Sequence, residues 1–344
     1  MSPNPLVGAV LVKDGRAVAR GYHHRFGGPH AEVECLRSYK GNMRNTTLYV
    51  NLEPCTHYGK TPPCVDLVID SGIRHVVIAM KDPNPLVAGR GIRELRRAGV
   101  RVTTDVMEGE ARELNRAFIV NMTKRRPFVH MKIAQTLDGK IALDRRSSTQ
   151  ITSSKSLKLV HRWRTEHDAV LVGAGTIHAD DPLLNVRLVK GRDPAVVILD
   201  GNLSLNSSHR IFRSAQHRRV IVFAANHVAI RKRRAIQALA LAGVRIVTVE
   251  SRNTRLPVKS ILRKLSQLDV NSVLVEGGAR VFSQFLNAGL VDRLSVFIAP
   301  RVLREGVPAF DETLLSLRQT HPYSGGELTG QQVGVDVLLQ CNFD

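Results

Sequence analysis

The sequence predicts an α/β protein made of two consecutive domains. Apolar runs of strand length alternate with helical patterns along the whole chain. The length of 344 residues is more than one hydrophobic core usually serves. A basic segment that ends in proline, residues 123–127, interrupts the alternation. We therefore expect one domain over residues 1–125 and a second over residues 126–344.

The first domain starts with a hairpin signal. The turn Lys13-Asp14-Gly15-Arg16 separates two apolar runs, and Asp-Gly is a preferred hairpin dipeptide. The expected elements are strands 7–12 and 17–22, a helix from residue 33, strand 46–52, helix 65–71, strand 75–80, helix 91–98 and strand 100–103. A single amphipathic helix is expected over 108–124, because Leu114, Phe118 and Met122 recur at fourfold spacing. This rhythm favours a mostly parallel sheet covered by helices.

The second domain repeats the alternation of strands and helices. The expected elements are strand 128–134, helix 154–165, strands 169–172, 195–199, 220–223, 244–249, 272–275 and 294–298, and a terminal strand over 333–340. Many strands with short helices between them indicate a second α/β sheet.

The charge balance predicts an anionic ligand. The chain has 50 Lys and Arg against 30 Asp and Glu, a formal net charge of +20, which attracts nucleic acid, phosphorylated metabolites or anionic lipid. Aromatic residues make up only 5%, which leaves few platforms for stacking bases. The densest basic runs, 124–126 and 231–234, are short and are typical of solvated linkers or helix faces. Charge alone does not choose among these ligands.

The expected location is the cytoplasm. No apolar run reaches the roughly 18 uncharged residues of a membrane span. The N-terminus lacks the basic and apolar regions of a secretory signal. Four cysteines are too few for a disulfide scaffold, so a close pair of them is expected to bind metal or to take part in catalysis.

The strongest chemical signal combines EPCTHYGKTPPC, residues 53–64, with the upstream segment Pro29-His30-Ala31-Glu32. His30, Cys55 and Cys64 offer one imidazole and two thiolates, which leaves the fourth position of a tetrahedral zinc ion for water, as in catalytic sites. Zinc lowers the pKa of that water toward 7. Glu32 is not needed as a ligand and can carry a proton from the water to a leaving amine. Histidine, glutamate and cysteine in this order are typical of zinc deaminases.

Two other interpretations account for part of this pattern. Each residue taken alone is better explained as a buried thiol or a hydrogen-bonded histidine. A structural zinc ribbon would need a fourth protein ligand, for which His57 is the candidate. The ribbon explains neither Glu32 nor the βαβ context.

The spacing of the cysteines separates families of deaminases. Nucleic-acid and nucleoside deaminases typically have a second cysteine three positions after the first, whereas here it follows nine positions on. With the segments Pro3–Gly8, Gly21–His23, Asp82–Pro85 and Val87–Gly91, the domain resembles the deaminase half of the bifunctional riboflavin-biosynthesis deaminase/reductase.

That resemblance implies a cytidine-deaminase-like α/β/α fold, with Zn²⁺ bound by His30, Cys55 and Cys64 and Glu32 as the proton shuttle. It also implies a substrate pocket formed by Asn4, His23, His57, Lys60, Asp82 and Asn84. An amide and a carboxylate can read a pyrimidine edge, and Lys60 with the histidines suits a ribose phosphate. Taken alone, Asp82–Pro85 is only a proline-fixed turn.

The second domain carries a separate set of motifs. Lys132–Lys140, Thr165–Thr176, Ala179–Pro182 and Val275–Arg280, in this order, resemble the reductase half of the same family. Gly277-Gly278 lies between a predicted strand and a predicted helix, where backbone N–H groups can hold a phosphate. There is no G-x-G-x-x-G motif, so the sequence does not support a classical dinucleotide-binding fold.

The resemblance implies a dihydrofolate-reductase-like α/β fold and NADPH as hydride donor. The implied cofactor contacts are Ala134, Gln150, Thr176, Asp180, Gly278, Ala279, Arg280, Val281, Phe282, Ser283 and Gln284. The implied sugar-phosphate contacts are Lys132, Ser148, Arg164, Leu184, Arg187 and Glu276. Arg164 and Arg187 are expected to clamp phosphate. Lys132 and Asp180 are expected to polarise or protonate the ribose carbonyl as hydride arrives.

The chain departs from the family at three points. It starts almost at Pro3-Asn4-Pro5, without the helix that usually precedes this motif, so part of a sheet face is expected to be exposed. Gln150 stands where the family usually has tryptophan, and Gly201 stands where a serine often follows the strand aspartate. The last two changes weaken the implied cofactor contacts.

The predicted function is a zinc-dependent deaminase joined to an NADPH-dependent reductase in riboflavin biosynthesis, acting on phosphorylated pyrimidines. No nucleic acid and no membrane is expected as a partner, and the oligomeric state stays open, a homo-oligomer included. Two alternatives remain: a nucleic-acid-editing deaminase with an appended binding domain, and a basic nucleic-acid-binding protein with structural zinc.

Overall fold

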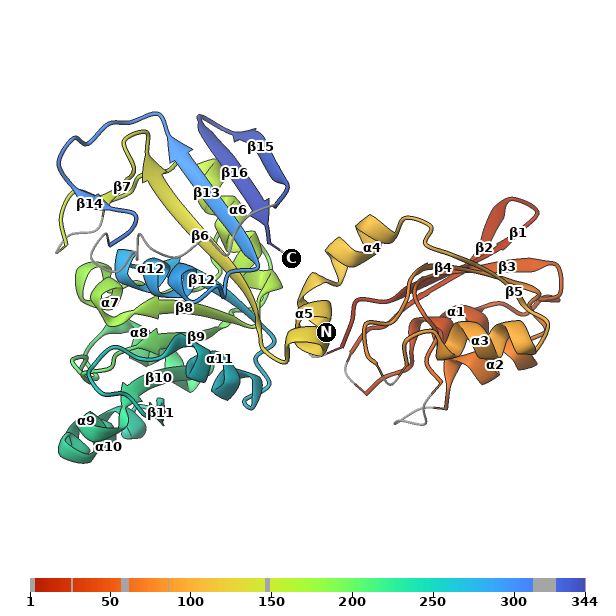
Figure 1. Cartoon of the computed structure of the whole chain (residues 1–344), viewed down its shortest axis with the longest axis horizontal. Coiled ribbons are helices and arrows are strands. Elements are labelled where there is room, and N and C mark those ends of the chain that lie inside the picture. The colour runs from red at the N-terminus through yellow and green to blue at the C-terminus, as the bar shows by residue number, and fades with distance from the viewer. Residues whose placement is uncertain are drawn as a thin grey trace. The chain divides into compact units, whose positions relative to one another are not determined.

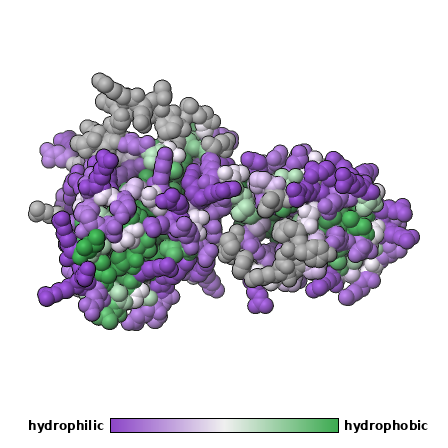
Figure 2. Space-filling model, turned by 60° about the horizontal axis from the view of Figure 1, so that its bottom comes forward, coloured by the Kyte–Doolittle hydropathy of each residue, from purple (hydrophilic) through white to green (hydrophobic). Residues whose placement is uncertain are grey.

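The computed structural model describes residues 4–25, 27–56, 62–85, 87–145, 149–311 and 326–343. The chain divides into two compact units, Met1–Arg125 and Arg126–Asp344. Each unit has its own sheet, and both combine strands with helices, as the α/β prediction required (Figure 1). The face drawn in Figure 2 is largely hydrophilic on both units. No helix in these ranges is long and apolar enough to cross a membrane.

Within the described residues, the first unit has a five-stranded sheet in the order β2-β1-β3-β4-β5. Its first elements are β1 Gly8–Lys13, β2 Arg16–Tyr22, α1 Ala31–Ser38, β3 Thr46–Leu52, α2 Cys64–Asp70, β4 His75–Met80, α3 Arg90–Arg97 and β5 Arg101–Thr104. Strands β3, β4 and β5 are parallel, whereas β1 is antiparallel to both β2 and β3. Asp14 and Gly15 both have positive φ, +47° and +72°, which the tight turn between β1 and β2 requires.

One face of this sheet is covered and the other is partly exposed. Leu11, Leu48 and Ile78 are fully buried in a core that also contains Leu36 of α1 and Leu95 of α3. Residues of alternate parity point the other way: Val18 of β2 and Tyr49 of β3 are 38% and 42% exposed.

The helix expected over 108–124 is two helices, α4 Glu108–Leu114 and α5 Arg116–Lys124. They are separated by Asn115, whose side chain is 2% exposed and binds the backbone of Leu6. Its Oδ1 accepts from Leu6 N at 2.7 Å and its Nδ2 donates to Leu6 O at 3.1 Å. Leu114, expected on the packed face, is 52% exposed. The single-helix prediction was wrong because the fourfold spacing of apolar residues does not reveal that Asn115 hydrogen-bonds to a distant backbone segment and interrupts the helix.

In the described part of the second unit, nine strands form one sheet in the order β11-β10-β9-β8-β12-β6-β13-β16-β15. Its strands are β6 Phe128–Thr136, β8 Ala169–Gly173, β9 Ala195–Leu199, β10 Val220–Ala225, β11 Arg245–Val249, β12 Ser272–Gly277, β13 Arg293–Ala299, β15 Leu328–Val333 and β16 Asp336–Asn342, with β7 Lys140–Ala142 and β14 Val307–Pro308 forming a separate pair. Its helices are α6 Ser154–Glu166, α7 Ala174–Asp180, α8 Arg210–Arg213, the 3₁₀ helix η1 Ser214–Gln216, α9 Asn226–Arg231, α10 Arg233–Leu241, α11 Val258–Ser266 and α12 Ala279–Asn287. The strands from β11 to β13 are parallel. Every residue of β8 and β10 is buried, which explains their continuous apolar sequences.

The terminal strand expected over 333–340 is present as β16, but it begins at Asp336 and forms a hairpin with β15 that the sequence did not predict. β15 and β16 are antiparallel and turn between Val333 and Asp336, and β16 also pairs with β13. Gly334 in the turn has φ +69°, a value that residues with a side chain rarely adopt. The alternating valines on either side of this glycine continue across the turn in sequence, so the pattern did not reveal the reversal.

Candidate active sites

A cluster of metal-binding side chains forms in the first unit. The ligand atoms of His30, Cys55 and Cys64 lie within 4.8 Å of one another. His30 Nδ1 is 3.2 Å from Cys64 Sγ and 3.5 Å from Cys55 Sγ. His30 precedes α1, Cys55 follows β3 and Cys64 begins α2, so the fold brings three separate elements to one point. One imidazole and two thiols at this separation fit a tetrahedral zinc ion with one position left for a fourth ligand.

The two cysteines influence each other. A hydrogen bond from the Cys64 side chain, together with one from His30 and against the effect of burial, lowers the pKa of the Cys55 thiol to about 4. The same shared hydrogen bond and burial raise the pKa of Cys64. The pKa of His30 is raised chiefly by its hydrogen bond to Cys55. Because thiolates bind metal, the pair has one thiol already inclined to lose its proton.

Glu32 lies on the first turn of α1, two residues after His30, and is 3% exposed. Burial raises the pKa of its carboxyl, and the negative charge of Cys55 raises it further. A carboxyl with a raised pKa holds a proton more readily than an exposed one, which suits a group that carries a proton. It also hydrogen-bonds to the Cys64 side chain. Glu32 is therefore placed to move a proton beside the metal ligands.

Asn4 and His23, both expected in the substrate pocket, are hydrogen-bonded to each other. His23 Nδ1 is 2.8 Å from the carbonyl oxygen of Pro29, which can only accept, so Nδ1 carries the hydrogen. His23 Nε2 then accepts from Asn4 Nδ2 at 2.7 Å. The rings of His23 and His30 meet edge to face, with centroids 5.7 Å apart. This pair therefore lies next to a metal ligand.

Asp82 and Asn84 lie in the loop that follows β4. Asn84 N donates to Asp82 Oδ1 at 2.8 Å, which closes a short turn. Asp82 N donates to Oε2 of the buried Glu53 at 3.2 Å. Glu53 had no assigned role in the sequence interpretation, and its only signal there is its position at the start of the EPC segment. His57 and Lys60 lie outside the described residues.

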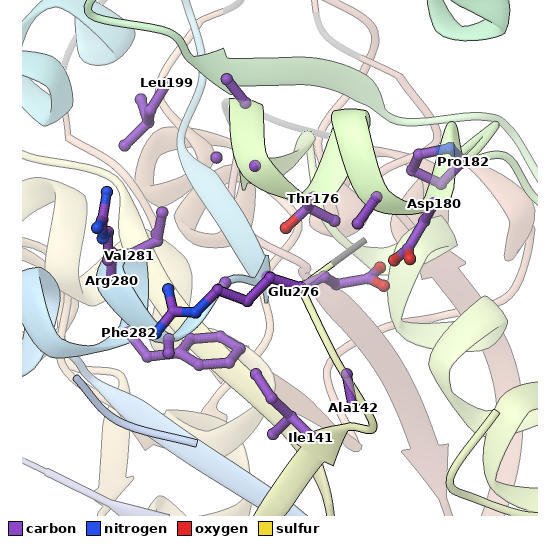
Figure 3. A pocket seen from close by; sticks show the side chains of 18 of the residues that line it. Ile141, Ala142, Thr176, Asp180, Pro182, Leu199, Glu276, Arg280, Val281 and Phe282 are labelled. Carbon is purple, nitrogen blue, oxygen red and sulfur yellow. The ribbon is translucent and has the colours of Figure 1, made fainter. Parts of the chain in front are cut away.

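The second unit contains a cavity of about 1520 Å³ at the carboxyl ends of β8, β9 and β12. This is where ligands bind in open parallel sheets. Thr176 and Asp180 from α7 and Glu276 from β12 project into it (Figure 3). The sequence-predicted residues that line it are Lys132, Ala134, Gln150, Arg164, Thr176, Asp180, Leu184, Arg187, Glu276, Gly278, Ala279, Arg280, Val281, Phe282 and Gln284.

Two predicted residues are not among the lining residues. Ser283 is fully buried, and its hydroxyl accepts from Asp311 N at 2.9 Å. Its side chain therefore packs inside the protein, and a direct side-chain contact with a cofactor in the cavity is not supported. Ser148 lies outside the described residues.

Arg164 is committed to an internal ion pair. Its Nε and Nη2 donate to the two oxygens of Glu276 at 2.6 and 2.7 Å, and its Nη1 donates to Asn185 O at 2.9 Å. The side chains of Arg164 and Glu276 are only 10% and 7% exposed. This pairing and the bond to Asn185 use three of the five N–H groups of Arg164, and phosphate binding by this residue stays a prediction. Arg187 also lines the cavity.

Lys132 lies beside this ion pair. Burial lowers the pKa of its ammonium group, and the positive charge of Arg164 adds to the effect while Glu276 opposes it. Although burial acts to raise it, the pKa of Glu276 is lowered by Arg164 and by Lys132. Glu276 therefore stays ionised between two cations, and Lys132 gives up a proton more readily than an exposed lysine.

The Gly277-Gly278 step is required by close packing. A Cβ atom at Gly277 would lie 2.8 Å from Thr176 Oγ1, and Gly278 has φ +89° immediately before α12. The first turn of α12 lines the cavity, so its free backbone N–H groups can meet a phosphate. Gly201 is equally constrained, since a Cβ atom there would lie 1.8 Å from Thr254 O. Gln150, the other departure from the family, lines the cavity.

Comparisons with known proteins cover both units. The model of the RibD C-terminal domain family matches residues 127–327, and that of the cytidine and deoxycytidylate deaminase zinc-binding region matches residues 1–80. The riboflavin biosynthesis protein RibD of Aquifex aeolicus is 43% identical over 92% of this chain and 87% of its own length. RibD of Escherichia coli strain K12 is 37% identical over 88% of this chain and 83% of its own length.

A solved structure agrees over nearly the whole length. It is the diaminohydroxyphosphoribosylaminopyrimidine deaminase/5-amino-6-(5-phosphoribosylamino)uracil reductase of Thermotoga maritima, 41% identical, with a TM-score of 0.86. The match covers 99% of this chain and 93% of that one. With this identity and coverage, the chain belongs to the RibD family of riboflavin biosynthesis proteins.

Proposed function

We propose that the chain catalyses two successive steps of riboflavin biosynthesis. Residues 1–125 deaminate 2,5-diamino-6-ribosylamino-4(3H)-pyrimidinone 5′-phosphate, and residues 126–344 reduce the resulting 5-amino-6-(5-phosphoribosylamino)uracil with NADPH. The observation that carries the proposal is the convergence of His30, Cys55 and Cys64 beside the buried Glu32. The name of the related Thermotoga maritima enzyme supports both substrates, and the name of the Aquifex aeolicus relative supports the pathway.

Deamination needs a nucleophilic water and a proton carrier. Zn²⁺ held by His30, Cys55 and Cys64 supplies the Lewis acidity that makes a water nucleophilic near neutral pH. Glu32 would accept one proton of that water as its oxygen bonds to the ring carbon and the ring C=N double bond becomes single. Glu32 would then deliver this proton to the amino group, which leaves as ammonia when its C–N bond breaks, and the remaining hydroxyl proton passes to the ring nitrogen as the carbonyl forms. The raised pKa of Glu32 suits both halves of this transfer.

Residues around the metal ligands bind the pyrimidine and its phosphate. The amide groups of Asn4 and Asn84 can donate to and accept from the edge of the ring, and the carboxylate of Asp82 can accept from it. His23 orients Asn4 through their hydrogen bond of 2.7 Å. His57 and Lys60 are proposed to bind the ribose phosphate.

Reduction adds a hydride to C1 of the ribosyl group and breaks the bond from C1 to the ring oxygen, which takes up a proton. Thr176 and the start of α12 in the cavity would hold NADPH, which would supply the hydride. Lys132 or Asp180 would donate the proton to the released oxygen, and the product keeps its C1–N bond as a ribitylamino group. The lowered pKa of Lys132 favours it as the donor, and the negative charge of Glu276 favours its ammonium form. Arg187 is proposed to bind the phosphate.

A paired assay tests the proposal and its rival. Ammonia release and NADPH oxidation are measured on the free pyrimidine phosphates, and ammonia release is also measured on RNA and single-stranded DNA. We expect both activities on the small molecules and none on nucleic acid. Ammonia release from nucleic acid alone would favour the editing deaminase. The absence of both activities would refute the proposed function.

All four cysteines are free, which suits the cytoplasm as the site of both steps.

A further inference from the structure

The buried carboxylate of Glu53 collects backbone N–H groups from the substrate loop. Glu53 is 3% exposed. Its Oε2 accepts from Asp82 N at 3.2 Å and from Gly89 N at 2.9 Å, and its Oε1 accepts from Ile92 N at 3.2 Å. Its own N–H donates to Met80 O at 3.0 Å. The carboxylate thus joins the ends of β3 and β4 to the start of α3.

These donors mark the two ends of one loop. Asp82 N opens the turn that Asp82 Oδ1 closes by accepting from Asn84 N. Gly89 is the residue before α3, and Ile92 lies in its first turn. The first N–H groups of a helix have no partner within the helix, and a carboxylate both satisfies them and matches the positive end of the helix dipole. Glu53 therefore fixes the loop where it begins and where it ends.

Close packing reinforces the same arrangement. A Cβ atom at Gly91 would lie 2.3 Å from Pro54 O and 3.2 Å from Glu53 Oε1. The start of α3 thus rests directly on the backbone between Glu53 and Cys55. Asp82 is linked to the metal ligand Cys55 through the side chain of Glu53 and the two peptide units that follow it. The position of Asp82 relative to Cys55 can therefore vary little.

We propose that Glu53 is a positioning residue for deamination. It holds Asp82 and Asn84 at the separation from the metal ligands that the bound pyrimidine requires. The inference rests on the proposed deaminase function and adds to it a residue that touches neither metal nor substrate. Its removal weakens binding of the pyrimidine phosphate while the zinc site and Glu32 stay intact.

Glu53→Gln tests the inference in the full-length, zinc-loaded enzyme. One carboxylate oxygen becomes an NH₂ group, which faces backbone donors and cannot accept from them. We expect KM for the diaminopyrimidine substrate to rise about tenfold, equivalent to about 1.4 kcal/mol. We expect kcat within about twofold of the original and an unchanged zinc content. Glu94→Gln on α3 makes the same chemical change away from these contacts and serves as the matched control.

The outcomes separate the positioning role from others. An unchanged KM with lower kcat, or loss of zinc from Glu53→Gln, would overturn the inference. A raised KM in Glu94→Gln as well would also overturn it. If Glu53→Gln does not fold, Glu53→Asp is judged by the same criteria, since it keeps the charge but shortens the reach. If the unmodified enzyme released no ammonia, the proposed function itself would be refuted.

Discussion

Arg218 donates from Nη1 to the carbonyl oxygen of Leu184 at 2.9 Å, and Leu184 has a left-handed backbone with φ +49°. Nη2 of Arg218 donates to the preceding carbonyl, that of Leu183. A non-glycine residue in this region costs on the order of 1 kcal/mol, so the conformation needs support from its surroundings. Leu184 lines the reductase cavity. Through these two hydrogen bonds, Arg218 stabilises a strained backbone segment of the proposed substrate site.

Arg218→Lys is expected to impair reduction selectively. Lysine keeps the charge but lacks the planar fork that reaches two carbonyl oxygens. We expect KM for the phosphoribosylaminouracil substrate to rise about tenfold, as for loss of one charged hydrogen bond of about 1.5 kcal/mol. Steady-state NADPH oxidation measures it, and ammonia release by the same protein should not change. Arg213→Lys, at an exposed position, is the control. Equal KM values in both variants would contradict the role of Arg218.

Glu32→Gln is expected to abolish deamination and to leave zinc bound. Glutamine has nearly the same shape but cannot carry the proton, and general acid–base groups contribute about 10²- to 10⁴-fold. We expect ammonia release to fall by at least about 10²-fold, with zinc content and NADPH oxidation unchanged. Deamination that persists at the original rate would refute the proton-shuttle role. A loss of zinc would show that Glu32 supports the metal ligands instead.

Local patterns predicted the bounds of several strands. The expected bounds 46–52, 75–80 and 195–199 coincide with β3, β4 and β9. The apolar runs of β4 and β9 end where the strands end, whereas β3 alternates between buried and more exposed residues. The error over residues 108–124 came from a contact between residues far apart in sequence. Asn115 separates two helices because its side chain binds Leu6, and the ion-pair partner of Arg164 is likewise 112 residues away, at Glu276. No spacing rule registers such partners.

The same reason explains which site residues were found. The zinc ligands are recognisable because catalytic zinc demands particular side chains in a short motif. Glu53 and Arg218 hydrogen-bond to backbone atoms of other segments. Any sequence that follows the same backbone path would offer the same atoms, so the identity of the partner residues does not reveal the contact. Only the folded chain identifies such residues.

Gly201→Ser is expected to destabilise the second unit. The new Cβ atom would lie 1.8 Å from Thr254 O, so the segment around Thr254 must move. Forcing extra atoms into a packed site typically costs about 1–3 kcal/mol. We expect a lower free energy of unfolding and a higher KM for NADPH, because Thr254 and Leu256 line the cavity. Gly109→Ala, with open space around its Cβ position, is the control. Unchanged stability in Gly201→Ser would show that the Thr254 segment moves without cost.

Acid is expected to destabilise the second unit through buried histidines. Burial lowers the pKa of His167 to about 4, and burial together with the charge of His167 lowers the pKa of His130 well below its ordinary value. Their rings are 5.1 Å apart. His130 Nδ1 has no hydrogen-bond partner among the described residues. Both histidines are therefore neutral in the folded protein at neutral pH.

The direction of the pH effect follows from proton binding. Unfolded histidine has a pKa of about 6.5, so below that pH the unfolded chain binds more protons than the folded one. The free energy of unfolding should therefore fall as pH drops from about 6.5 toward 4, by up to about 1.4 kcal/mol per pH unit for each histidine. Above about 6.5 these two groups contribute no pH dependence.

The fluorescence of Trp163 reports the unfolding of the second unit. It is the only tryptophan in the chain, and its ring centroid lies 4.8 Å from that of His130. Urea unfolding followed by its fluorescence at pH 5 and pH 7 gives the two free energies. His167→Gln should reduce the difference between them, because glutamine does not titrate, whereas the exposed His217→Gln should preserve it. An equal difference in all three proteins would show that His167 does not cause the acid sensitivity.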